Sequence, residues 1–139
     1  MPARHWCRRR PFGTNLRLWG GFVLRVGART VYFAGDSGYD PVIFPTISQR
    51  CGAPDLALLP IGAYEPRWFM APHHMNPAEA VQVHCDVGAG LSLAMHWGTF
   101  QLTDEGREEP VQALEAARRA AGVAEGAFRV PLQGESVDF

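Results

Sequence analysis

The chain has 139 residues, of which 47% are hydrophobic and 19% charged, and its formal net charge is −1. This composition is typical of a single folded domain and argues against a disordered chain. The near-neutral charge gives no general electrostatic basis for binding nucleic acid, and no apolar run is long enough to span a bilayer.

The first predicted elements are two strands that form a hairpin. Residues 22–26 and 30–34 are rich in β-branched and aromatic side chains, and Gly27 lies between them. Two short, nearly continuous apolar runs at 56–61 and 91–95 show the pattern of strands that are covered on both faces. A weaker strand is predicted at 128–132.

Three helices are predicted between these strands, over residues 40–52, 76–88 and 110–121. Capping side chains and prolines indicate where they begin, and glycines indicate where they end. The residues that carry these signals are Asp40 with Pro41 and Gly52, Asn76 with Pro77 and Gly88, and Pro110 with Gly122. Pro45 should make the first turn of the first helix irregular. The order β-β-α-β-α-β-α-β predicts an α/β fold.

Candidate ligands follow three of the predicted strands at their carboxyl ends, where ligands gather in α/β sheets. They are Asp36 in "AGDSGYD", the "GAYEPRW" loop and His96. The His96 imidazole could bind a metal through one nitrogen while an acceptor orients the other, or it could be a buried histidine with ordinary partners. The Asp36 carboxylate could bridge two metal ions, or it could cap a turn or a helix.

Two adjacent histidines, His73 and His74, lie just before the Asn76 cap. The start of a helix favours an anion such as phosphate, and a histidine there could orient a substrate phosphate or donate a proton. A solvated loop is the alternative. His84 falls inside the predicted helix, and we assign it no catalytic role.

An apolar stretch precedes these histidines, and an arginine run lies near the N-terminus. Trp68, Phe69 and Met70 could form a lip for an acyl chain, or they could pack within their own loop. The arginines at 8–10 could hold a phosphate, although a solvated charge run is the commoner case.

Cysteine usage and the N-terminal residues bear on location. The three cysteines include no CxxC pair, which favours a reducing compartment. The stretch "CRRRPFGTNLRLWGGFVL" superficially resembles a twin-arginine export signal, but Arg17 and Arg25 interrupt its apolar part and no clear cleavage site follows. A cytoplasmic location is therefore predicted.

Six stretches, taken in order, carry a resemblance to a known family. They are "PARHWCRR", "FAGDSGY", "DLALLPIGAYEPRWFM", "NPAEAV", "AMHWGTF" and "GES". Together they resemble the C-terminal half of the metallo-β-lactamase superfamily. More narrowly, they resemble its N-acyl-phosphatidylethanolamine-hydrolysing phospholipase D branch and bacterial relatives, from about residue 2 to residue 136. The order of the stretches makes the resemblance specific, since no single one would.

The resemblance implies an αββα sandwich built from two similar halves, with a mixed sheet, flanking helices and two zinc ions between the halves. It implies that His5 ligates one ion, that His96 ligates the other and that Asp36 bridges both. His74 would act beside the substrate phosphate. A zinc-activated water would attack phosphorus and release a phosphatidic acid and an N-acyl ethanolamine.

The sequence departs from the family pattern in one large respect. The H-x-H-x-D-H motif of the family's N-terminal half does not occur here, so residues 1–139 are expected to form one domain that corresponds to the C-terminal half. His5, Asp36 and His96 cannot fill two zinc coordination spheres, so the chain alone should bind metal weakly and its activity in isolation is doubtful.

An uncovered sheet face should then favour a homodimer or a complementing N-terminal half. The expected substrate is a phospholipid, which would bring peripheral membrane contact. Hydrolysis of another phosphodiester or of a lactone stays open, as does an inactive fragment that serves as an interaction module.

Overall fold

The computed structural model describes residues 3–4 and 18–139. Its strands form a five-stranded sheet in the order β3-β4-β5-β6-β7 and a separate pair, β1 with β2. Their bounds are β1 Ala3–Arg4, β2 Leu18–Trp19, β3 Phe22–Val26, β4 Arg29–Phe33, β5 Leu56–Pro60, β6 Leu91–Met95 and β7 Phe128–Arg129. In the larger sheet β3 is antiparallel to β4 and the other neighbours are parallel. The sheet is mixed, and the predicted α/β class is confirmed.

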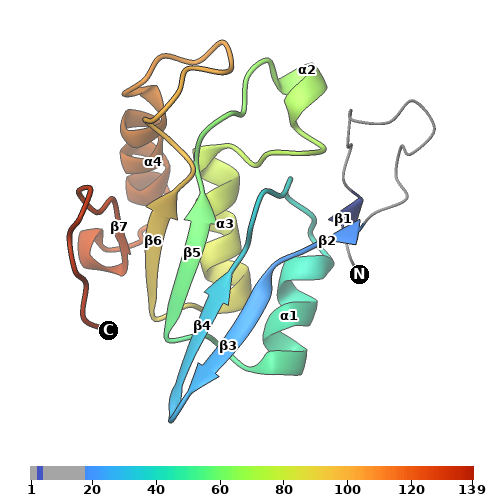
Figure 1. The fold of residues 1–139 in the computed structure, drawn as a ribbon, viewed down its shortest axis with the longest axis vertical. Helices are drawn as coiled ribbons and strands as arrows, with labels where there is room; N and C mark the ends of the chain where they lie inside the picture. The colour runs from blue at the N-terminus through green and yellow to red at the C-terminus, as the bar shows by residue number, and fades with distance from the viewer. Residues whose placement is uncertain (1–2, 5–17) are drawn as a thin grey trace.

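The helices pack on one another and on this sheet. They are α1 Ile43–Cys51, α2 Arg67–Met70, α3 Pro77–Val87, α4 Glu109–Ala120 and a 3₁₀ turn, η1, at Glu125–Ala127. Helix α3 lies behind the sheet and contacts both α1 and α4 (Figure 1). Buried side chains of the strands and of these helices form one core, which includes Tyr32, Phe44, Leu59, Val83, Leu114 and Phe128.

The start of α3 follows directly from its sequence. The Asn76 side chain accepts a hydrogen bond from the Glu79 backbone N–H, and the Glu79 carboxylate accepts one from the Asn76 backbone N–H, each at 2.8 Å. This reciprocal capping box, with Pro77 at the first helical position, satisfies donors that a helix start otherwise leaves unpaired. Gly88 closes the helix in the left-handed conformation, as predicted.

Two predicted boundaries are wrong by two residues or more, and one predicted loop is helical. Helix α1 begins at Ile43, because the Asp40 carboxylate caps it from three residues before, accepting from the Val42 and Ile43 N–H groups. Pro45 is tolerated there because the first turn of a helix needs no donor from it. The stretch 67–70, expected as loop, forms α2. Strand β7 ends at Arg129, three residues before the predicted end.

Parallel pairing brings the carboxyl ends of β4, β5 and β6 to one edge of the sheet (Figure 1). The loops that follow these strands carry Asp36, Gly62 and His96. Helix α2 lies at the same end of the molecule, in the segment that follows β5. The edge predicted to gather ligands therefore does collect these residues.

The sheet face turned away from the helices is apolar and partly exposed. Tyr32 belongs to the core under the helices, so its neighbours in β4 point to the opposite face. The strand register pairs those neighbours with Phe22 and Leu24, which are exposed together with Val26, and Phe22 is 64% exposed. The prediction that a second copy or a complementing half covers this face stays a prediction.

None of the helices in the described part of the chain has the length and apolar character needed to cross a bilayer. The cytoplasmic location stays a prediction.

A buried histidine links α3 to the sheet. The Nδ1 atom of His84 lies 2.8 Å from the Ser92 hydroxyl oxygen in β6, and both side chains are buried. The His84 ring lies beside the Phe128 ring, with centroids 5.8 Å apart. Burial lowers the pKa of His84 below its ordinary value. Its place behind the sheet agrees with the absence of a catalytic role.

We expect this histidine to make the fold less stable in mild acid. In the unfolded chain the imidazole takes up a proton at about pH 6.5. In the folded protein it does so only at lower pH. Between these two pKa values the unfolded state binds more protons, so the free energy of unfolding falls as pH decreases. Urea unfolding between pH 7.5 and 5.5, or roughly that range, should show a shallower pH slope for His84→Gln. An equal slope in both proteins would contradict this role of His84.

Candidate metal centre

The centre of the candidate site is a contact between His96 and Asp36. His96 is the first residue after β6, and Asp36 lies in the turn after β4. The Nε2 atom of His96 is 3.4 Å from an Asp36 carboxylate oxygen. His96 has φ = +59°, a left-handed conformation that is uncommon for a side chain other than glycine. Backbone strain of this kind clusters at functional sites, which supports the prediction that the His96 imidazole at the end of the strand has a functional role.

Two partners hold the His96 ring. The hydrogen bond with Asp36 is the largest cause of a raised pKa and outweighs burial, which acts in the opposite direction. A hydrogen bond with the Gly62 backbone raises the pKa of His96 further. The ring has Nε2 turned to the Asp36 carboxylate, a position from which an imidazole can bind a metal beside that carboxylate.

His74 stacks on this ring. The two imidazole centroids are 5.2 Å apart and the ring planes are inclined by 29°. Burial, followed by the neighbouring His96, lowers the pKa of His74. Its Nδ1 atom is buried and finds no hydrogen-bond partner among the described residues. Because buried polar atoms are rarely left without partners, this nitrogen is a candidate contact for a bound group.

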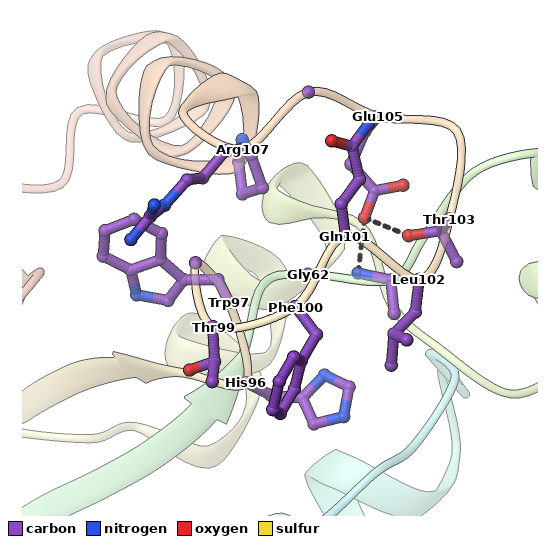
Figure 2. Close-up of a pocket in the computed structure, with 14 residues that line it drawn as sticks. Gly62, His96, Trp97, Thr99, Phe100, Gln101, Leu102, Thr103, Glu105 and Arg107 are labelled. Carbon is purple, nitrogen blue, oxygen red and sulfur yellow. Dashed lines mark hydrogen bonds between the residues drawn. The ribbon is translucent and has the colours of Figure 1, made fainter.

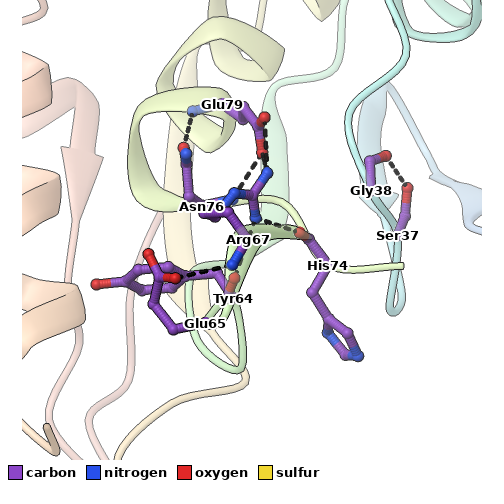
Figure 3. Close-up of polar contacts among 8 residues, drawn as sticks. All are labelled: Ser37, Gly38, Tyr64, Glu65, Arg67, His74, Asn76 and Glu79. Atoms are coloured by element: carbon purple, nitrogen blue, oxygen red, sulfur yellow. Dashed lines mark hydrogen bonds and ion pairs between the residues drawn. The ribbon is translucent and has the colours of Figure 1, made fainter. Parts of the chain in front are cut away.

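A guanidinium group holds the His74 backbone (Figure 3). Arg67 donates to the His74 carbonyl oxygen at 2.9 Å and to both Glu79 carboxylate oxygens at 2.9 and 2.8 Å. Glu79 is also the residue that closes the capping box of α3. The histidine loop is therefore fixed to the helix start by a bidentate, charge-assisted pair. Sequence analysis missed Arg67, since a lone arginine after Pro66 carries no signal of this role.

The Asp36 loop is packed directly against the same histidine segment. The Ser37 carbonyl oxygen accepts the Met75 N–H at 2.9 Å. At Gly38 a Cβ atom would lie 2.5 Å from the Ala71 carbonyl oxygen, so glycine permits this approach. The two loops therefore set each other's position, and with it the position of Asp36 relative to His74.

The residues predicted to bind substrate lie on and after α2. The Trp68 and Phe69 rings contact each other, and the Phe69 ring also lies beside His73, with centroids 5.7 and 6.3 Å apart respectively. His73 thus points toward the aromatic pair, whereas His74 joins the site. The Met70 carbonyl oxygen accepts the N–H groups of both histidines at 2.8 Å. Trp68 is 85% exposed, so its contact with Phe69 leaves most of its surface open.

A cavity of about 570 Å³ opens beside His96 (Figure 2). The loop after β6 supplies most of its lining, and Gly62, Ala63 and Pro110 complete it. Phe100 and Leu102, which line it, are 77% and 79% exposed. Sequence analysis missed these two side chains, although an exposed apolar pair directly after "HWGT" was the available signal.

The side chains in the contact between His96 and Asp36 are of the types that bind zinc. Imidazole nitrogen and carboxylate oxygen are both zinc ligands, and His96 and Asp36 supply one of each in contact. Within residues 20–139, no group of three potential ligands is close enough to hold a metal ion. The predicted ligand His5 lies outside the described residues. The described donors therefore fit zinc in type, and they number fewer than a zinc site needs.

Comparison with known proteins agrees with this arrangement. The family model described as "Beta-lactamase superfamily domain" matches residues 1–97. The chain is 47% identical over 116 residues to N-acyl-phosphatidylethanolamine-hydrolyzing phospholipase D 1 of Caenorhabditis elegans, covering 83% of this chain and 33% of that protein. It is 42% identical over 116 residues to the mitochondrial enzyme of the same description from Saccharomyces cerevisiae, covering 82% and 25%. The chain thus spans a quarter to a third of these relatives' length.

A solved structure shows the same fold. Igni18, described as a novel metallo hydrolase from Ignicoccus hospitalis, superposes with a TM-score of 0.65 and 26% sequence identity. The match covers 99% of this chain and 50% of that one. The chain is therefore similar to half of a metallo hydrolase of known structure.

Gly38→Ala should disturb the contact between the two loops. The added methyl group would meet backbone atoms of residues 71 and 72 at 2.5 to 2.8 Å, and no rotamer change can relieve that clash. We expect a loss of about 1–3 kcal/mol in the free energy of unfolding, with shifted NMR signals of the His74 ring. Gly126→Ala, where no atom lies within 4 Å, is the matched control. Equal effects of the two substitutions would argue against the packing described here.

Proposed function

The chain belongs to the beta-lactamase superfamily, and on this basis we propose that its function is metal-dependent hydrolysis of a phosphodiester bond in lipids that resemble N-acyl-phosphatidylethanolamine. The observation that carries the proposal is the cluster at the carboxyl edge of the sheet. There Asp36 contacts His96, and His74 stacks on the His96 ring. The relatives described as phospholipases D support the reaction class.

In this proposal, His96 and Asp36 hold zinc together with His5. Zinc, when bound, lowers the pKa of a water molecule to about 7 and stabilises developing negative charge. The Gly62 backbone packs against the His96 backbone and helps to hold it in place, since a Cβ atom at Gly62 would lie 2.3 Å from the His96 carbonyl oxygen. The short distance between His96 and Asp36 allows both side chains to serve one metal cluster.

His74 is the proposed proton-handling residue. A lowered pKa leaves its ring neutral at physiological pH, so the ring has one N–H to donate and one nitrogen to accept. A neutral imidazole can donate to a phosphate oxygen or pass a proton to the leaving oxygen. The clamp by Arg67 on the His74 carbonyl group keeps the ring in place for this role.

Exposed apolar side chains on two loops support a lipid substrate. Trp68 and Phe69 precede His74 in the sequence. Phe100 and Leu102 line the cavity beside His96. Such side chains exposed together at a site mark a surface for an apolar ligand. An acyl chain of the substrate would lie along them, and contact with a membrane surface would follow from the same chemistry.

We also propose that the apolar face of β3 is covered in the active protein, by a second half of the sandwich or by a second copy. The exposed Phe22, Leu24 and Val26 support this, as does the match to half of a solved hydrolase. A covering half is the natural source of the remaining zinc ligands.

Removing zinc or His96 should abolish the proposed activity. We expect hydrolysis of N-acyl-phosphatidylethanolamine to stop with a chelator and to return with zinc. His96→Ala should lower both zinc content and hydrolysis. Loss of an outer-shell partner of a metal typically costs about 10- to 100-fold, and loss of a ligand should cost at least as much. Glu115→Gln, on the exposed surface of α4, is the control. Elemental mass spectrometry after gel filtration gives the zinc content. Hydrolysis that persists without metal would contradict the proposal, as would no hydrolysis at any zinc concentration once the covering half is present.

Substitutions in the aromatic pair should act on lipids alone. Trp68→Ser and Phe69→Ser remove apolar surface, so we expect kcat/KM for a long-chain lipid to fall by roughly tenfold or more, since burying such a side chain is worth about 1.5–3 kcal/mol. Hydrolysis of a short, soluble phosphodiester should not change. Leu132→Ser, exposed after β7, serves as the control. If the unaltered protein hydrolysed short soluble esters better than lipids, the proposal of a lipid substrate would be wrong.

A further inference from the structure

We propose that Glu105 is a positioning residue for the candidate metal site, because its buried carboxylate fixes the loop after β5 and, through Gly62, the orientation of the His96 ring. The inference rests on the proposed function, since the orientation of this ring matters where His96 binds a metal.

The Glu105 side chain is enclosed between two loops, and the residue is 7% exposed. Its carboxylate accepts hydrogen bonds from the Ala63 N–H at 2.6 Å, the Glu65 N–H at 3.0 Å and the Thr103 hydroxyl at 2.7 Å. Figure 2 shows the bond from Thr103. None of the ion pairs in the described part of the chain includes Glu105. A buried carboxylate with neutral donors of this kind serves the geometry of the backbone that supplies them.

Charge on Glu105 is part of this geometry. Burial alone would raise the pKa of Glu105, but the hydrogen bonds from Thr103 and from the loop backbone outweigh burial and lower it. The side chain is therefore an ionised acceptor, and its hydrogen bonds are charge-assisted.

The loop that Glu105 holds is strained and has no room to move. Ala63 has φ = +61°, a conformation that L residues rarely adopt, and its N–H is the one that Glu105 accepts at the shortest distance. The preceding residue, Gly62, presses on the other loop, since a Cβ atom there would lie 2.3 Å from the His96 carbonyl oxygen. A rearrangement at Ala63 is therefore transmitted to His96 through Gly62.

Gly62 also bears on the His96 side chain. A hydrogen bond with its backbone is one of the causes that raise the pKa of His96. The chain of contacts thus runs from the Glu105 carboxylate through the Ala63 and Gly62 backbone to the His96 ring. Partners that orient a metal ligand in this way affect a metal site nearly as strongly as the ligands do.

The test compares Glu105→Gln with Glu115→Gln, which makes the same chemical change on the exposed surface of α4. The glutamine amide keeps the size of the side chain but turns one acceptor into a donor, so it faces the loop N–H groups with the wrong polarity. In the metal-free protein, NMR should show shifted His96 ring signals and loss of the ring's contact with Gly62. The His84 ring, behind the sheet, should be unchanged and reports that the fold is intact.

In zinc-loaded protein, Glu105→Gln should lower kcat by about 10- to 100-fold while KM changes little. Thr103→Val, which removes one of the three hydrogen bonds, should give a smaller change in the same direction and keeps the test decisive if the glutamine variant fails to fold. Unchanged His96 ring signals in a folded Glu105 or Thr103 variant would overturn the proposal, even if the melting temperature fell. If the unaltered protein hydrolyses no phosphodiester, the proposed function fails, but the ring signals still decide the role of Glu105.

Discussion

Parallel pairing of β4, β5 and β6 is the constraint on which the site depends. Parallel strands have their carboxyl ends at one edge of the sheet. Asp36 and His96 therefore meet there although they lie 60 positions apart in the sequence. The pairing is possible because β5 and β6 are almost wholly apolar and can be buried on both faces. Helices α1 and α3 supply the crossovers that parallel strands require.

Two carboxylates, one half-buried and one buried, give the loops at this edge their shape. Glu79 closes the start of α3 and holds Arg67, which in turn holds the His74 carbonyl group. Glu105 performs the equivalent task for the loop after β5. An exposed pair such as Glu115 with Arg119 contributes at most about 1 kcal/mol, whereas a buried carboxylate that lost its donors would cost more. The polar contacts therefore matter for geometry more than for total stability.

The sheet that positions the site also has an apolar surface on the face turned away from the helices. The helices cover one face, and on the other face β3 exposes Phe22, Leu24 and Val26. Parallel strands are usually covered on both faces, so this exposed apolar face is the one that the proposed second layer would cover.

Local signals in the sequence determined the elements of this protein, and tertiary contacts determined how the site is held. Apolar runs and cap residues predicted five strands, three helices and their order, because hydrophobic periodicity and capping act over a few residues. The meeting of Asp36 with His96 followed from the rule for strand ends. The stacking of His74 on His96 and the support by Glu105 could not be predicted, since each joins loops that are distant in sequence. The clamp by Arg67 is local, but a lone arginine carries no signal of it. A carboxylate or guanidinium has the same local sequence signature whether it is solvated or buried, and only the folded chain decides which donors it meets.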